Sequence, residues 1–211
     1  MLARYPLLIF FCISSAAANA LHDDNYTFVR TGLGFNNRVP GEQKIDGASW
    51  FIHGAYQVPA MPFVVNAGYS FGRVDKDEIR SFTGAQSVEI DGSSYYAGAS
   101  VVLRPSERLH MIPSFTVGRV RNSMVADALA ATSKSTALAS SLTFRYQLYD
   151  GLWLNTGYVQ QYHLGHGDQG GRPGYLTAGS EYQVNKLWGL GVNYRGNAAQ
   201  YATRLYLKFF L

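Results

Sequence analysis

Two histidines and an aspartate lie close together in one Gly-containing segment of the chain, as His163, His166 and Asp168. Two imidazoles three residues apart, with a carboxylate nearby, can ligate one metal ion. The same groups could serve as an acid–base group for hydrolysis. A polar surface loop has the same composition, so a hydrolase at this segment stays an alternative. We therefore assign no catalytic residue, no metal site and no cofactor from the sequence.

A second group consists of single charged or imidazole side chains set among alternating apolar residues. Its members are His53, Arg104, His110, Arg145, Glu181, Arg195, Arg204 and Lys208. Isolated charges in an enclosed interior must be paired or hydrated, because burying them alone is costly. Glu181 is the only acid of the group, and it could pair with Arg195 or, across the interior, with Arg145 or Arg204. Two interpretations follow, an interior structural network or a constriction that prefers anions.

The first twenty residues have the pattern of a secretory signal peptide. Arg4 precedes the apolar run 7–13, and small residues end in Ala18-Asn19-Ala20. The run is shorter than the roughly 20 residues that a membrane-spanning helix needs. We predict cleavage after residue 20 and a single domain over 21–211. The only cysteine, Cys12, lies inside the signal, so the mature chain has no disulfide or thiolate ligand.

The charge of the chain gives no sign of a nucleic-acid partner. The formal net charge is +4, and Arg4 accounts for one unit of it, which leaves +3 for the predicted mature chain. The basic residues are scattered rather than gathered in runs, which is unlike a nucleic-acid-binding surface.

Nearly the whole mature chain alternates with a period of two, which predicts β-strands with unlike faces. The ten runs are 26–35, 48–58, 63–74, 93–104, 109–121, 135–148, 152–164, 174–184, 187–195 and 200–211. The polar face is rich in Gly, Ser, Asn and Gln, and the apolar face carries Tyr and Trp near strand ends. A soluble β-sandwich would show Lys, Glu and Thr on its outer face, whereas this pattern is typical of a membrane barrel.

The connections between the runs alternate in length. The short ones are 59–62, 105–108, 149–151 and 185–186, and the long ones are 36–47, 75–92, 122–134 and 165–173, with a modest one at 196–199. Segment 126–132 could form a helical turn or continue a strand. Lipid offers no hydrogen bonds, so a sheet that crosses it must close on itself. We predict a transmembrane antiparallel up-and-down β-barrel of ten strands, or eight if two runs are loop.

The last run resembles the C-terminal assembly signal of outer-membrane barrels. Its outward residues are Tyr201, Leu205, Leu207, Phe209 and Leu211, with Leu211 where that signal usually ends in an aromatic residue. The resemblance implies recognition by the barrel-assembly machinery. The mature chain as a whole is similar in architecture to the small OmpA/OmpX-type barrels. That similarity implies a place in the outer membrane of a Gram-negative bacterium.

The expected function follows from architecture rather than from a motif. A structural or surface-interaction role through the loops is the leading interpretation, and a narrow anion-preferring channel is the second. Basic residues in the long connections are expected to hold lipopolysaccharide phosphates, beside a possible extracellular ligand. They are Arg38, Lys44, Lys76, Arg80, Lys134 and Arg172. The His-x-Ser pair of lipid A deacylases is absent at His163 and His166.

Overall fold

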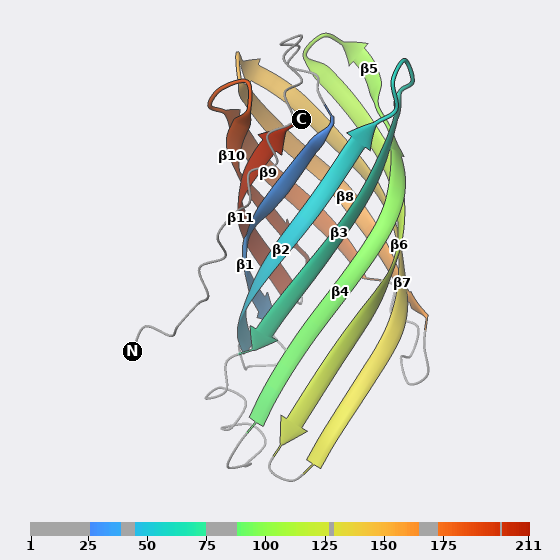
Figure 1. Ribbon diagram of the computed structural model, residues 1–211, viewed down its shortest axis with the longest axis vertical. Coiled ribbons are helices and arrows are strands. Elements are labelled where there is room, and N and C mark those ends of the chain that lie inside the picture. Colours follow the sequence, from blue (N-terminus) through green and yellow to red (C-terminus); the bar gives the residue numbers. More distant parts are fainter. Residues whose placement is uncertain (1–25, 39–44, 75–87, 127–128, 165–172, 199) are drawn as a thin grey trace.

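The computed structural model describes residues 26–38, 45–74, 88–126, 129–164, 173–198 and 200–211 (Figure 1). The strands are β1 (Phe28–Arg38), β2 (Ile45–Gln57), β3 (Phe63–Val74), β4 (Val88–Val101), β5 (Leu103–Ser106), β6 (Leu109–Ala126), β7 (Leu129–Tyr149), β8 (Leu152–Leu164), β9 (Gly174–Gln183), β10 (Trp188–Gly196) and β11 (Gln200–Phe210). Among these described residues, no helix has the length and apolar character needed to cross a membrane.

The strands form one closed antiparallel sheet. Neighbours in sequence pair in order from β1 to β4 and from β6 to β11, and β1 pairs with β11. The pairing of β4 with β6 completes the closure. The short β5 pairs only with β6 and is an extra strand outside the ring. The predicted ten-stranded barrel is therefore confirmed, and the eight-stranded alternative is excluded.

The two ends of the barrel differ in their connections. At one end, called the turn end, consecutive strands are joined through residues 58–62, 107–108, 150–151 and 184–187. The opposite end, called the loop end, is where β1, β3, β6, β8 and β10 end and where β2, β4, β7, β9 and β11 begin. Short turns facing the periplasm and longer loops facing outward are the general rule for outer-membrane barrels.

Successive side chains point alternately into the lumen and away from it. In β3, Val64 is buried while Val65 is exposed, and the same alternation runs through the other strands. The outward face carries large apolar side chains such as Leu33, Ile52 and Leu205. Such a surface is unstable in water but suits the hydrocarbon of a bilayer, where aliphatic side chains meet lipid chains.

Tyrosines on the outward face gather toward both ends of the strands. Tyr56 and Tyr146 lie close to the turn end, whereas Tyr69, Tyr95 and Tyr201 lie toward the loop end. All five are exposed on the outside of the barrel. Amphipathic aromatic rings at two levels mark the two boundaries between hydrocarbon and water.

Several strands run beyond their predicted ends at the loop end. β1, β2 and β4 extend into the predicted loops 36–47 and 75–92, and β4 also ends at Val101 rather than at residue 104. The extension is longest in β6 and β7. The predicted loop 122–134 is mostly strand, because β6 reaches Ala126 and β7 begins at Leu129. These residues pair in register, for example Ser123 with Thr132. Alanine is frequent in this segment, and Met124 and Val125, on opposite faces of β6, are both exposed. The apolar alternation therefore stops at the membrane boundary while the backbone ladder continues.

Candidate functional site

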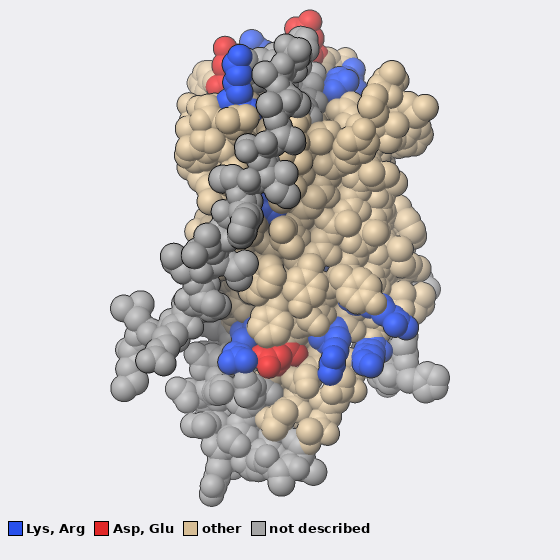
Figure 2. Space-filling model, in the orientation of Figure 1, with Lys and Arg blue, Asp and Glu red and all other residues tan. Residues whose placement is uncertain are grey.

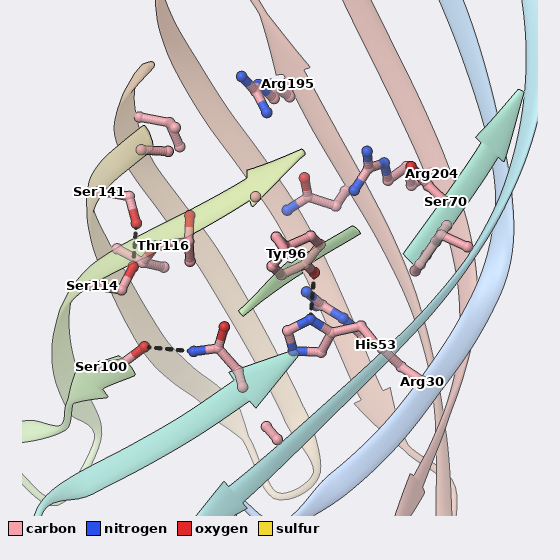
Figure 3. Close-up of a pocket in the computed structure, with 18 of the residues that line it drawn as sticks. Arg30, His53, Ser70, Tyr96, Ser100, Ser114, Thr116, Ser141, Arg195 and Arg204 are labelled. Carbon is pink, nitrogen blue, oxygen red and sulfur yellow. Dashed lines mark hydrogen bonds between the residues drawn. The ribbon is translucent and has the colours of Figure 1, made fainter. Parts of the chain in front are cut away.

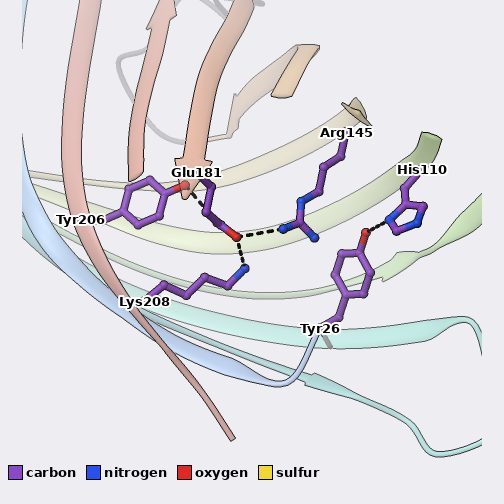
Figure 4. Close-up of polar contacts among 6 residues, drawn as sticks. All are labelled: Tyr26, His110, Arg145, Glu181, Tyr206 and Lys208. Carbon is purple, nitrogen blue, oxygen red and sulfur yellow. Dashed lines mark hydrogen bonds and ion pairs between the residues drawn. The ribbon is translucent and has the colours of Figure 1, made fainter. Parts of the chain in front are cut away.

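A carboxylate surrounded by cations lies at the turn end of the lumen (Figure 4). Glu181 of β9 accepts a hydrogen bond from the Arg145 guanidinium at 2.8 Å and from Lys208 Nζ at 2.7 Å. The Tyr206 hydroxyl donates to the other carboxylate oxygen at 3.2 Å. All four side chains are buried, so Glu181 offsets part of the charge of the two cations in a region shielded from water.

Aromatic side chains surround this network and fill the space between the strands. The Arg145 guanidinium lies 4.0 Å from the centre of the Trp153 ring. His110 contacts the same indole with 5.0 Å between ring centres, and its Nδ1 lies 2.5 Å from the Tyr26 hydroxyl. Trp153 is 1% exposed and His110 is 0% exposed. We call Tyr26, His110, Arg145, Trp153, Glu181 and Lys208 the closing layer.

A small apolar cluster lies beside the closing layer. Tyr26, Val64 and Val102 are buried together, with Ala55 and Ile112 packed against them. These residues come from the turn ends of their strands. Polar and apolar side chains thus fill the cross-section of the lumen near the turn end. Filling of this kind is usual for barrels of about eight strands, whose interior is only wide enough for side chains.

Toward the loop end the lumen widens into a cavity of about 450 Å³ (Figure 3). Within the described residues, five cationic side chains point into the lumen or its closing layer, and Glu181 is the one acid beside them. The cations are Arg30, Arg145, Arg195, Arg204 and Lys208. His53 Nδ1 lies 2.5 Å from the Tyr96 hydroxyl inside the cavity. The cavity, called the chamber below, therefore has a positive interior.

A second basic group lies on the outside of the barrel, toward the loop end. Arg119 and Arg121 of β6 and Lys134 of β7 are exposed, and Arg121 pairs in register with Lys134. On the adjoining strands, Arg73 forms an exposed ion pair with Asp91 at 2.8 Å. Figure 2 shows Lys and Arg side chains gathered below the broad tan surface, with an acidic group among them. We call Arg73, Arg119, Arg121 and Lys134 the rim patch.

The register places the rim patch level with the outer aromatic residues and just beyond them. Tyr95 of β4 is paired with Arg119 and with Tyr69, and the next outward row holds Phe71, Ser93 and Arg121. In the other direction the next row on β3, β4 and β6 is apolar, with Ala67, Ala97 and Val117. The cations therefore begin where the apolar surface ends.

Solved structures with this architecture are bacterial outer-membrane proteins. The transport unit of the autotransporter AIDA-I from Escherichia coli matches with a TM-score of 0.53 at 12% identity, over 91% of this chain and 92% of that one. The translocator domain of the autotransporter NalP from Neisseria meningitidis matches with a TM-score of 0.51 at 12% identity, over 92% and 90%. The chain folds as an outer-membrane β-barrel. No model of a protein family and no curated protein matches its sequence.

Most of the predicted lumen residues of this outer-membrane barrel lie inside it. Those are His53, His110, Arg145, Glu181, Arg195, Arg204 and Lys208. Glu181 pairs with Arg145, one of its predicted partners, and with Lys208, which was not among them. Arg195 instead donates to the Gln161 side-chain oxygen at 2.7 Å.

Arg104 departs from its predicted place in the lumen. The chain leaves the barrel ladder at Val102, and Arg104 lies beyond it on β5, where its side chain is exposed. β5 is the strand outside the closed ring, so Arg104 is near the turn end and does not line the chamber. Alternation therefore predicts an inward side chain only where the strand belongs to the closed ring.

Several residues that line the lumen were not among those predicted from the sequence. Arg30, Tyr26, Trp153 and Tyr206 all contribute to the interior. The alternation of the strands could have predicted these positions. Arg30, for example, is two residues from the buried Phe28 on β1, so both side chains point to the same face. Tyr206 alternates with the outward residues of the last run, which already predicts an inward position for it.

The predicted rim chemistry falls largely outside the described residues. His163 lies near the end of β8, but His166 and Asp168 are beyond it. In the described part of the chain, no group of three or more His, Cys, Asp or Glu could hold a metal ion. Of the predicted basic loop residues, Lys134 belongs to β7 and the rim patch, and Arg38 ends β1. Lys44, Lys76, Arg80 and Arg172 lie outside the described residues, as does the predicted cleavage site.

The predicted assembly signal forms the strand that closes the barrel. β11 pairs with β10 on one side and with β1 on the other. Tyr201, Leu205 and Leu207 are exposed on the outer face, Phe209 is half-buried, and Leu211 follows the strand. The alternation in this segment thus has a structural role in the ring. Recognition by the assembly machinery stays a prediction.

Proposed function

We propose that this protein is an integral outer-membrane surface protein that holds the phosphate groups of lipopolysaccharide against its rim patch. The observation that carries the proposal is the position of Arg73, Arg119, Arg121 and Lys134 immediately beyond the outer apolar surface. Anionic headgroups occupy this level of a bilayer. A structural or surface-interaction role was the leading interpretation of the sequence. The rim patch would serve that role as a binding site for phosphate groups.

Guanidinium groups suit phosphate because they donate parallel hydrogen bonds to two of its oxygens. The rim patch consists of four cations, and among the described side chains Asp91 is the one acid paired with it, so positive charge is in surplus there. Cross-strand pairing of Arg121 with Lys134 places two cations side by side. Their mutual repulsion is relieved when an anion lies between them, which favours a phosphate over a neutral headgroup.

The test compares two matched triple variants of the refolded mature chain in neutral lipid vesicles. One carries Arg119→Gln, Arg121→Gln and Lys134→Gln, and the other carries Arg104→Gln, Arg108→Gln and Lys186→Gln at the turn end, where all three side chains are exposed. We expect the rim variant to bind purified lipopolysaccharide about tenfold or more weakly, since charged hydrogen bonds contribute about 1.5–3 kcal/mol each. The turn-end variant should bind normally.

A further arm uses lipopolysaccharide from which the phosphates have been removed. It should bind the unaltered protein as weakly as the rim variant binds the native lipid. Equal losses in both triple variants would show a general charge effect and contradict the proposal. The heat-dependent gel mobility of each variant establishes that the barrel has formed.

An anion-preferring channel is the second candidate, and the positive chamber favours it. Against it stands the closing layer, in which Trp153 and His110 are completely buried. A channel would require these side chains to move aside together with the ion pairs of Glu181. The chamber therefore supports anion entry from the loop end more readily than passage through the barrel.

A further inference from the structure

The chamber has two chemically different walls. Arg30 of β1, Arg195 of β10 and Arg204 of β11 project from neighbouring strands of the closed sheet (Figure 3). Hydroxyl groups line the wall formed by β3, β4, β6 and β7. They include the hydrogen-bonded pairs Ser70 with Ser94 and Ser114 with Ser141, and also Thr116. A molecule inside the chamber would meet guanidinium groups on one side and hydroxyl groups on the other.

The guanidinium groups on the basic wall have few partners within the described part of the chain. The Arg30 Nε is buried and makes no hydrogen bond there. The Arg30 guanidinium lies 5.3 Å from the Tyr206 ring centre, and the Arg204 guanidinium lies 5.1 Å from that of Phe51. For Arg204 the described residues provide no hydrogen bond or ion pair beyond this ring contact. Arg195 donates to the Gln161 amide oxygen and lies over Tyr175.

No carboxylate of the described lumen is available to these three arginines. Glu181 is already engaged by Arg145, Lys208 and Tyr206 in the closing layer. Cations held together in a confined space without an anion repel one another, and an unpaired buried donor is destabilising. A protein that keeps such a set of donors gains if an anion occupies the space between them.

We propose that the chamber binds a small hydroxylated oxyanion, an organic phosphate or carboxylate whose anionic group meets Arg30 and Arg204. Its hydroxyl groups exchange hydrogen bonds with the Ser and Thr side chains of the opposite wall, since hydroxyls both donate and accept. Arg195 lies toward the loop end of the same wall. A cavity of about 450 Å³ lies within the range of small-ligand sites. This site is separate from the rim patch, which faces the outside of the barrel.

Calorimetric titration of the folded mature chain in a neutral detergent tests the site. The probes are glycerol 3-phosphate, glycerate, inorganic phosphate and glycerol. We expect glycerol 3-phosphate to bind more tightly than inorganic phosphate, because only the former reaches the hydroxyl wall. Glycerate shows whether a carboxylate serves as well as a phosphate, and glycerol should not bind because it lacks the charge.

The variant pair Arg30→Gln with Arg204→Gln should weaken binding of glycerol 3-phosphate by about tenfold or more, from the loss of charged hydrogen bonds. Arg104→Gln with Arg108→Gln, exposed at the turn end and outside the chamber, is the matched control and should bind normally. Arg30→Lys with Arg204→Lys keeps the charge but loses the planar fork, and should show an intermediate loss. The outcome of these titrations is independent of whether the rim patch binds lipopolysaccharide.

Each remaining outcome overturns the chamber site. Absence of binding by both hydroxylated anions would exclude it. Equal affinity for inorganic phosphate and glycerol 3-phosphate would show that the hydroxyl wall takes no part. Unchanged affinity in the Arg30 and Arg204 double variant, with its fold established by gel mobility, would show that any bound anion lies elsewhere.

Discussion

Glu181 is the residue on which the charge balance of the closing layer depends. One carboxylate is shared by two buried cations, Arg145 and Lys208, at 2.8 and 2.7 Å. We predict that Glu181→Gln lowers the free energy of unfolding by about 3–5 kcal/mol, because removal of one partner leaves uncompensated buried charge. Urea titration of the protein in lipid vesicles, followed by tryptophan fluorescence, measures the change.

The exposed pair of Arg73 and Asp91 provides the control for this prediction. The side chains of that pair are 52% and 30% exposed, so Asp91→Asn should cost less than about 1 kcal/mol. Combining Glu181→Gln with Lys208→Met removes one of the two stranded cations and should restore part of the stability. Equal effects of Glu181→Gln and Asp91→Asn would mean that the closing layer is hydrated rather than buried.

Single residues also show where reasoning from the sequence reaches its limit. The inward position of Arg145 and Glu181 follows from period-two alternation, whereas their pairing depends on how strands distant in sequence face each other across the lumen. Arg104 obeys the alternation yet lies outside the ring, because the chain turns away at Val102. Alternation gives the face of a residue, and the point at which a strand leaves the barrel must come from the structure.

At the scale of elements, the sequence predicts strands best where one face meets lipid. β3 and β8 have the predicted bounds, Phe63–Val74 and Leu152–Leu164. β6 and β7 run past their predicted ends, because small and apolar residues on both faces erase the alternation while the hydrogen-bond ladder continues. Periodicity therefore reports the extent of the membrane-facing surface rather than the length of the strand.

The tight turn between β7 and β8 depends on a glycine. Gly151 has a φ of +77°, in a region that residues with a Cβ rarely adopt, and an added Cβ would lie 3.0 Å from the Gln183 carbonyl oxygen. We predict that Gly151→Ala destabilises the barrel by about 1–2 kcal/mol, the cost of a left-handed backbone for an L-residue. Urea titration in lipid vesicles measures it.

Gly54 in β2 is the matched control for this change. An added Cβ at Gly54 meets nothing within 4 Å, and its φ lies outside the left-handed region. Gly54→Ala should therefore leave the stability unchanged or raise it slightly, because alanine restricts the unfolded chain. A loss of stability at Gly54 as large as that at Gly151 would contradict the turn argument.

The whole molecule is positioned by its apolar outer surface, which predicts how the cost of a charge depends on depth. Leu205 is exposed at the middle of β11, and Leu187 is exposed at the turn end. Leu205→Arg should destabilise the protein by about 2–4 kcal/mol, the range for arginine at the midplane, while Leu187→Arg should cost about 0–1 kcal/mol. Urea titration in vesicles compares them, and equal costs would mean that the apolar surface does not meet lipid.

The arrangement of the lumen as a whole decides between a closed barrel and a channel. Because the closing layer fills the lumen near the turn end, we predict that the protein in a planar bilayer shows no steady conductance.

Replacing His110 and Trp153 by alanine removes the two most buried large side chains and should open a path. Its current should favour anions, because Arg30, Arg195 and Arg204 line the chamber above it. Trp50→Ala, on the outer face, is the matched control and should stay silent. Steady anion-selective steps from the unaltered protein would instead show that the closing layer yields to ions, and the chamber would then be the filter of a channel.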